Sequence, residues 1–317
     1  MEQYVRKTDK FLEGECEESY KQIFYYKKVL NIDDAATASL YENDIIDDED
    51  LKLIDFVYKT LVADEEQILE FCKLEGIENG AKRLEKCFIN VLLNKFALCT
   101  KESRFNKTKQ IPKNEDVKYF YCLTAGGKIL LNKYIYYPEN EIKWNNGSPC
   151  MSALNVRRAV ISTEHYLKMR SLSNLQIYRP LPTMFVHDKT IRVNNVCKLK
   201  ENGMENEPEY KDIITEIVLY GTEEAELRER FSILGTFLRT NSWQKYFFNK
   251  NMIKPTLLVI TEDDETVSDV TQMLMKELPS DSVFYITTIS RMRKGYDKVG
   301  SLLQYDEGTN SMKEISL

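Results

Sequence analysis

The chain has 317 residues and a formal net charge of −6 at pH 7, with 43% hydrophobic and 30% charged residues. This length allows two domains that each bury a core, and the composition is that of an ordinary soluble globular protein. No apolar run approaches the roughly 20 residues that a membrane-spanning helix requires, and the N-terminus is unlike a secretory signal. These features argue against a membrane protein and predict a cytoplasmic location.

Residues 1–50 are predicted to form a helical leader that ends in an acidic patch. Tyr20, Ile23 and Phe24 lie near helical spacing. Residues 42–50 (ENDIIDDED) are mostly Asp and Glu, which is typical of a solvated connector.

Three amphipathic helices are predicted next, over residues 51–61, 64–72 and 79–94, because apolar side chains recur at helical spacing in each of them. Asp64 lies three residues before Gln67, which is the spacing of a capping box at a helix N-terminus.

The third predicted helix carries cations on one side. Its apolar face consists of Ala81, Leu84, Phe88 and Val91. Its other side carries Lys82, Arg83, Lys86 and Asn90. Residues 79–133 contain 12 Lys and Arg against four Asp and Glu, so this stretch carries +8 and the rest of the chain −14. A cationic island on an acidic chain is the electrostatic footprint expected for a polyanion such as DNA.

Two strands follow, over residues 95–100 and 119–124, and a short helix then runs to Leu131. A polar loop between the strands carries Lys101, Arg104, Lys107, Lys109, Lys113 and Lys118. Three helices followed by strand, basic hairpin and strand predict a winged helix-turn-helix, whose wing lysines contact phosphates. A disordered surface loop is the alternative. If the wing is correct, the acidic patch at residues 42–50 is either a connector or a flap that competes with DNA for the basic face.

The second half of the chain predicts a mixed sheet flanked by helices, so the expected fold class is α+β. The best linker is residues 144–149 (WNNGSP). Helices are predicted over residues 154–171, 223–239 and 264–278. Strands are predicted over residues 182–187, 190–198, 213–220, 255–261 and 283–288. The expected domains are residues 1–50 (leader), 51–143 (winged helix), 150–293 (α/β domain) and 294–317 (tail).

This element order matches the core of the PD-(D/E)xK nuclease fold, in which an Asp and an E-x-K strand bind a divalent metal. Here Glu216 is present, but Val218 takes the lysine position and Pro182 is followed by Thr183. The nearest acid to that proline, Asp188, lies in a predicted turn. A single carboxylate is a poor Mg²⁺ site, so Glu216 is a vestigial candidate and no catalytic residue, metal or cofactor is expected.

A carboxylate inside an apolar strand needs a partner, and the candidates for Glu216 are Arg157, Arg158 and Arg239. Residues 262–265 (EDDE) follow another buried strand, where open sheets often place active-site acids. The alternative is an acidic helix start favoured by the helix dipole. The chain has only two histidines, and its cysteines form no close pair, so the sequence argues against a zinc site.

Three segments resemble motifs of the replication-relaxation proteins of Gram-positive plasmids and integrative elements. Residues 119–127 (YFYCLTAGG) are similar to the family's YYLTxxG, residues 214–223 (ITEIVLYGTE) to its EIDxGTE strand end, and residues 255–261 (PTLLVIT) to a later LVIT-type strand. The resemblance covers roughly residues 51–293 and departs from the family at Val218 and Thr183. It implies a winged helix, then a degenerate nuclease-like domain, in a DNA-binding accessory of replication or transfer.

The leading hypothesis is therefore a non-enzymatic DNA-binding accessory protein of a mobile genetic element. The third helix would enter the major groove, and the wing residues Arg104, Lys107, Lys109 and Lys113 would bind phosphates. Expected partners are double-stranded DNA, a replication initiator or relaxase, and a second copy of the chain. One alternative is a metal-dependent DNA nuclease with its site around Glu216. Another is a protein–protein adaptor whose winged helix binds no DNA.

Overall fold

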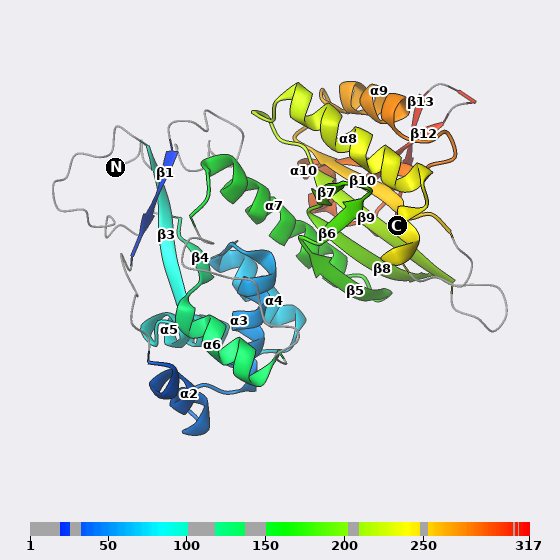
Figure 1. Cartoon of the computed structure of the whole chain (residues 1–317). Coiled ribbons are helices and arrows are strands. Elements are labelled where there is room, and N and C mark those ends of the chain that lie inside the picture. Colours follow the sequence, from blue (N-terminus) through cyan, green and yellow to red (C-terminus); the bar gives the residue numbers. More distant parts are fainter. Residues whose placement is uncertain are drawn as a thin grey trace. The chain divides into compact units, whose positions relative to one another are not determined.

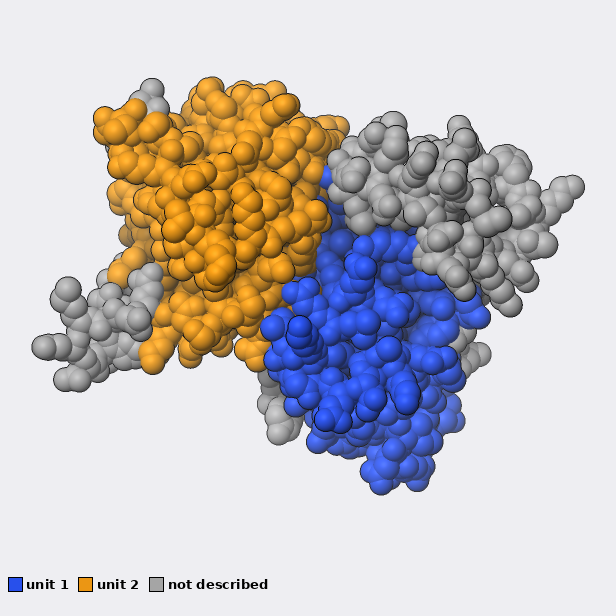
Figure 2. All heavy atoms as spheres, turned by 180° about the vertical axis from the view of Figure 1, so that it is seen from behind, with its two compact units in different colours: residues 1–163 blue, residues 164–317 orange. Residues whose placement is uncertain are grey.

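The computed structural model describes residues 20–25, 33–100, 118–136, 150–201, 209–247, 253–306, 308–309 and 311–317. The chain forms two compact units, unit 1 (residues 1–163) and unit 2 (residues 164–317), coloured blue and orange in Figure 2. The division falls inside helix α7 (Ala153–Arg170). In the described part of the chain, no helix is both long and apolar enough to span a bilayer. The predicted linker at residues 144–149 lies outside the described residues.

Unit 1 combines helices with a four-stranded sheet (Figure 1). Its elements before α7 are β1 (Tyr20–Phe24), α2 (Asp34–Glu42), α3 (Asp48–Thr60), β2 (Ala63–Asp64), α4 (Glu65–Leu74), α5 (Gly80–Ile89), β3 (Leu93–Thr100), β4 (Phe120–Leu123) and α6 (Ala125–Tyr134). The strands are antiparallel in the order β1-β3-β4-β2, so β4 lies between β3 and β2. The three predicted helices and the two predicted strands after them are confirmed as α3, α4, α5, β3 and β4.

Capping boxes fix where α3 and α4 begin. At α4, the backbone N–H of Gln67 donates to the Asp64 carboxylate at 2.9 Å, and the Asp64 N–H donates to Gln67 Oε1 at 3.1 Å. This is the predicted box. At α3, Asp47 and Asp50 form a second box with bonds of 3.0 Å in both directions. The acidic patch is therefore not only a connector, because its last residues start a helix.

The first half of α7 completes the core of unit 1. Val156 and Val160 pack with Phe96 and Phe120 of the sheet. The Gln67 side chain donates to the carbonyl oxygen of Val160 at 2.9 Å, so α4 is also bound to α7. Because these apolar side chains are buried together, the first half of α7 belongs to the hydrophobic core of unit 1.

The leader differs from its prediction. Residues Tyr20–Phe24, expected to be helical, form strand β1, which pairs with β3 from Tyr20↔Thr100 to Phe24↔Phe96. Aromatic and β-branched residues favour a strand. The hydrogen-bonding partner is the edge of β3, which is distant in sequence, so the spacing of apolar residues within the leader cannot reveal it. A helix does occur in the leader, but it is α2, at residues 34–42.

Unit 2 contains a seven-stranded mixed sheet and a separate hairpin. After α7 its elements are β5 (Leu175–Pro180), β6 (Thr183–Val186), β7 (Lys189–Arg192), β8 (Asn195–Glu201), β9 (Glu209–Ile217), α8 (Glu224–Arg239), η4 (Ser242–Lys245), β10 (Thr256–Thr261), α9 (Val267–Glu277), β11 (Phe284–Thr288), α10 (Ile289–Lys294), β12 (Leu302–Asp306) and β13 (Ser311–Ile315). The order is β13-β12-β11-β10-β9-β8-β5, with β9, β10 and β11 parallel and the other pairs antiparallel.

Helices cover both faces of this sheet. Neighbouring residues of a strand point to opposite faces. Thr215 of β9 contacts His165 of α7, whereas Glu216 contacts Arg230 of α8, so α7 and α8 lie on opposite faces. Helix α9 packs beside α8 (Figure 1), and a Cβ atom at Gly235 would lie only 2.1 Å from a carbonyl oxygen of α9.

Three predictions for unit 2 are wrong in part. The strand predicted over residues 190–198 is two strands, β7 and β8, which belong to different sheets. The strand predicted over residues 182–187 is β6, but it forms a two-stranded sheet with β7, and the strand of the large sheet in its place is β5. We also expected no element after residue 293, yet β12 and β13 extend the sheet beyond β11. These strands are short and partly exposed, so they have little apolar alternation to detect, and pairing with a formed sheet stabilises them.

Candidate nucleic-acid interface

Helix α5 presents three faces, and the cations expected to bind DNA are divided between two of them. Leu84 and Cys87 are buried against the rest of unit 1. Arg83, Lys86 and Asn90 are half-buried. The exposed residues of the helix are Ala81, Lys82, Glu85 and Ile89.

Arg83 and Lys86 bind carboxylates at the start of α3. We call Asp47, Glu49 and Asp50 the acidic clamp. The Arg83 guanidinium lies 2.7 Å from Asp47 and 3.0 Å from Asp50, and it also pairs with Glu49. The Lys86 ammonium pairs with Asp50 and lies 3.9 Å from Asp47. These ion pairs bind α5 to α3.

The carboxylates of the acidic clamp and the cations bound to them shift each other's pKa values. Burial acts to raise the pKa of Asp47, but hydrogen bonds from Arg83 and from the backbone of Asp50 outweigh it and lower the pKa to about 2. The hydrogen bond to Asp47 raises the pKa of Arg83 above its ordinary value. Asp50 is fully buried, so its charge depends on Arg83 and Lys86 for compensation.

The other two residues predicted to contact DNA through the third helix, Asn90 and Lys82, differ in whether a ligand could reach them. The Asn90 side chain donates to the carbonyl oxygen of Lys86 at 2.9 Å and closes the helix C-terminus. Lys82 is exposed and forms no ion pair with the residues that the structure describes. Of the three cations among the four predicted residues, Lys82 is therefore the one that the helix presents directly to solvent.

Cations beyond α5 are also paired within unit 1. Lys118 lies 2.9 Å from Asp64, and Lys133 lies 2.6 Å from Glu42. The Lys95 ammonium lies over the Phe88 ring at 4.5 Å from its centroid and also faces Tyr25 and Tyr119. The predicted wing residues Arg104, Lys107, Lys109 and Lys113 lie outside the described residues.

The vestigial candidate Glu216, for which Arg157, Arg158 or Arg239 was the expected partner, pairs with Arg230. Arg230 Nη2 donates to both carboxylate oxygens at 2.8 and 2.7 Å, and Glu216 is 2% exposed. Arg230 lies on α8, which covers the sheet face to which Glu216 points. Val218 packs against the apolar core on this face. Among the described side chains, no three His, Cys, Asp or Glu residues are grouped so as to hold a metal ion.

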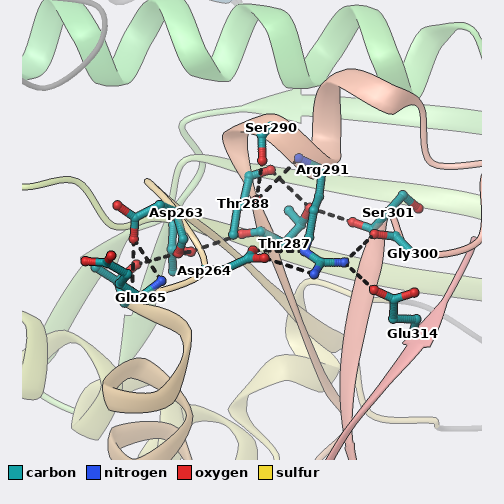
Figure 3. A network of polar contacts seen from close by, with 12 residues as sticks. Asp263, Asp264, Glu265, Thr287, Thr288, Ser290, Arg291, Gly300, Ser301 and Glu314 are labelled. Atoms are coloured by element: carbon teal, nitrogen blue, oxygen red, sulfur yellow. Dashed lines mark hydrogen bonds and ion pairs between the residues drawn. The ribbon is translucent and has the colours of Figure 1, made fainter.

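The acids after β10 belong to a satisfied polar network. Figure 3 shows the Arg291 guanidinium between the carboxylates of Asp264 and Glu314. It binds Asp264 at 2.9 and 3.0 Å, Glu314 at 2.8 Å and the carbonyl oxygen of Gly300 at 2.9 Å. These contacts use four of the five guanidinium donors. The network therefore ties β13 to the loop after β10 and leaves little capacity for a bound anion.

A buried polar cluster in unit 2 gave no signal in the sequence. His165 is fully buried, with Nδ1 2.6 Å from the Tyr296 hydroxyl and Nε2 3.3 Å from the Thr215 hydroxyl. Burial lowers the pKa of His165 to about 3, against an opposing hydrogen bond with Asn195. The imidazole is therefore neutral at pH 7. The one hint in the sequence is the position of His165 on the apolar side of the helix predicted over residues 154–171.

No protein-family model, no curated protein and no solved structure matches this chain.

Proposed function

We propose that the chain is a non-enzymatic protein that binds double-stranded DNA through a winged helix-turn-helix in unit 1. The observation that carries the proposal is the order α3, β2, α4, α5, β3, β4, with β4 between β3 and β2 in the sheet. A winged helix has this order of elements, and its third helix, here α5, enters the major groove. The sequence between β3 and β4 is the basic stretch that a wing requires.

Charge supports the same proposal. The stretch between β3 and β4 carries Lys101, Arg104, Lys107, Lys109 and Lys113. These residues would bind phosphates and supply affinity without sequence information. Lys82 would add a contact from α5. Arg83 and Lys86 would act indirectly, because they hold α5 against the acidic clamp.

The biological setting rests on the resemblance to replication-relaxation proteins alone. It suggests an accessory role in replication or transfer of a mobile element, with unit 2 serving as a degenerate nuclease-like domain that binds an initiator, a relaxase or a second copy of the chain. The bond between Glu216 and Arg230 favours a non-enzymatic unit 2, since a carboxylate paired with a guanidinium is not available to a metal.

The test is fluorescence anisotropy with a labelled random-sequence duplex, with the salt concentration varied from about 50 to about 200 mM. The full-length protein should bind, and Lys107→Ala/Lys109→Ala should weaken binding and lower the slope of log K against log salt by about 2. Lys276→Ala, which removes an exposed lysine from α9 in unit 2, is the control and should change nothing. Absence of binding at the lowest salt, or equal binding by all the variants, would contradict the proposal.

A protein–protein adaptor is the second candidate. One observation favours it: the acidic clamp neutralises two cations of α5, while the apolar Ile89 on the same helix is 62% exposed. Under this reading unit 1 shows no DNA affinity even at low salt, and Ile89→Asp abolishes binding of a protein partner while Lys107→Ala/Lys109→Ala does not.

A further inference from the structure

The exposed residues of α5 lie on a single stripe of the helix. Ala81, Glu85 and Ile89 are spaced by four residues, and Lys82 lies beside them. At 100° per residue these four positions fall within an arc of about 100°. Arg83 and Lys86 lie next to this arc, turned onto the acidic clamp. The stripe is therefore the part of α5 that a ligand can reach without breaking an ion pair.

The chemistry of this stripe is unusual for a surface that only binds phosphates. Glu85 is exposed and carries a negative charge, which phosphates repel. In the major groove, however, a carboxylate accepts a hydrogen bond from the N4 amino group of cytosine, and an apolar side chain contacts the thymine methyl group. Glu85 and Ile89 suit base edges, whereas Lys82 suits guanine or a phosphate.

We infer that Glu85 is a specificity-determining residue that selects a C·G base pair in the major groove, an inference that rests on the proposed DNA binding by α5. The neighbouring cations, Arg83 and Lys86, cannot take this role while the acidic clamp holds them. Glu85 lowers non-specific affinity through its charge and offsets this at sites where cytosine donates to it. Sequence discrimination and overall affinity should thus change in opposite directions when its charge is removed.

The experiment is selection of bound duplexes from a random-sequence pool by the full-length protein, followed by sequencing. The wild-type protein should enrich C·G at one position, and Glu85→Gln should shift that position toward A·T, because a glutamine amide pairs with adenine N6 and N7. Glu85→Gln should also bind the unselected pool more tightly than the wild-type protein. The selected C·G site should lose at least about fivefold in affinity when this pair is changed.

Glu226→Gln is the matched control, since it removes the same charge from an exposed position of α8 in unit 2. It should keep the wild-type preference. An enriched site that Glu85→Gln and Glu85→Ala leave unchanged, or binding without any preference, would overturn the role of Glu85 while DNA binding stands. If the wild-type protein recovers no DNA above a carrier protein, the proposed function itself fails.

Discussion

Arg83 Nη1 lies 2.7 and 2.8 Å from the two carboxylate oxygens of Asp47, although these residues are 36 positions apart in the chain. The contact joins the start of α3 to a cation that the sequence alone assigns to DNA. It binds Arg83 to α3, whereas Lys82 and Glu85 on the neighbouring stripe of α5 are exposed.

The first prediction compares Arg83 with the adjacent Lys82. Arg83→Met should lower the free energy of unfolding by about 1 to 3 kcal/mol, because the buried Asp50 loses one of the two cations that pair with it and keeps Lys86. Lys82→Met should change it by less than about 0.5 kcal/mol, since the side chain is exposed. Urea denaturation measures both. Equal stability of the two variants would show that the clamp does not hold α5.

The second prediction concerns acid. The folded protein keeps His165 neutral down to about pH 3, whereas the unfolded chain protonates it below its ordinary pKa of 6.5. The unfolded state therefore binds more protons between these values, and the free energy of unfolding falls as the pH is lowered through this window.

Urea denaturation at about pH 7 and about pH 5 tests this dependence, because few carboxylates titrate between these values. The decrease seen for the wild-type protein should be largely absent in His165→Gln. His187→Gln is the control, since His187 is exposed, and it should retain the decrease. If the decrease in the free energy of unfolding persists in His165→Gln, other titratable groups cause it.

The third prediction concerns the carboxylate on β9. Arg230→Met should destabilise the protein by about 3 kcal/mol, because it removes the guanidinium from the nearly buried Glu216. Arg228→Met is the matched control on the same helix: its pair with Glu224 is exposed and contributes less than about 1 kcal/mol. Thermal denaturation separates the two. Mg²⁺-dependent DNA nicking that is lost in Glu216→Ala would instead support a metal site.

The fourth prediction concerns the boundary of unit 1. A fragment ending at Pro149 lacks Val156 and Val160, which cover Phe96 and Phe120 of the sheet. This fragment should unfold less cooperatively on heating than a fragment ending at Arg170. It should also bind a hydrophobic dye, because its uncovered core side chains form an exposed apolar surface. Identical melting of the two fragments would place the boundary at the predicted linker.

Periodicity and capping made much of the fold predictable. Local signals, such as the Asp64–Gln67 spacing and the apolar repeats of α3, depend on residues close in sequence, and the structure retains them. Strands β1, β2, β5, β12 and β13 were not recognised, because each is short and depends on pairing with a neighbour that the sequence does not identify. The candidate site was predicted less well, since exposure of a cation depends on what packs against it.

The amino-acid sequence by itself determined the α+β class, the order of most helices and strands, and the basic stretch between β3 and β4, because these follow from local spacing and composition. Only the tertiary structure decided that Arg83 and Lys86 bind the acidic clamp, that Arg230 neutralises Glu216 and that His165 is buried. Each of these pairings joins residues whose attraction acts only after the helices and the sheet have brought them within a few ångströms.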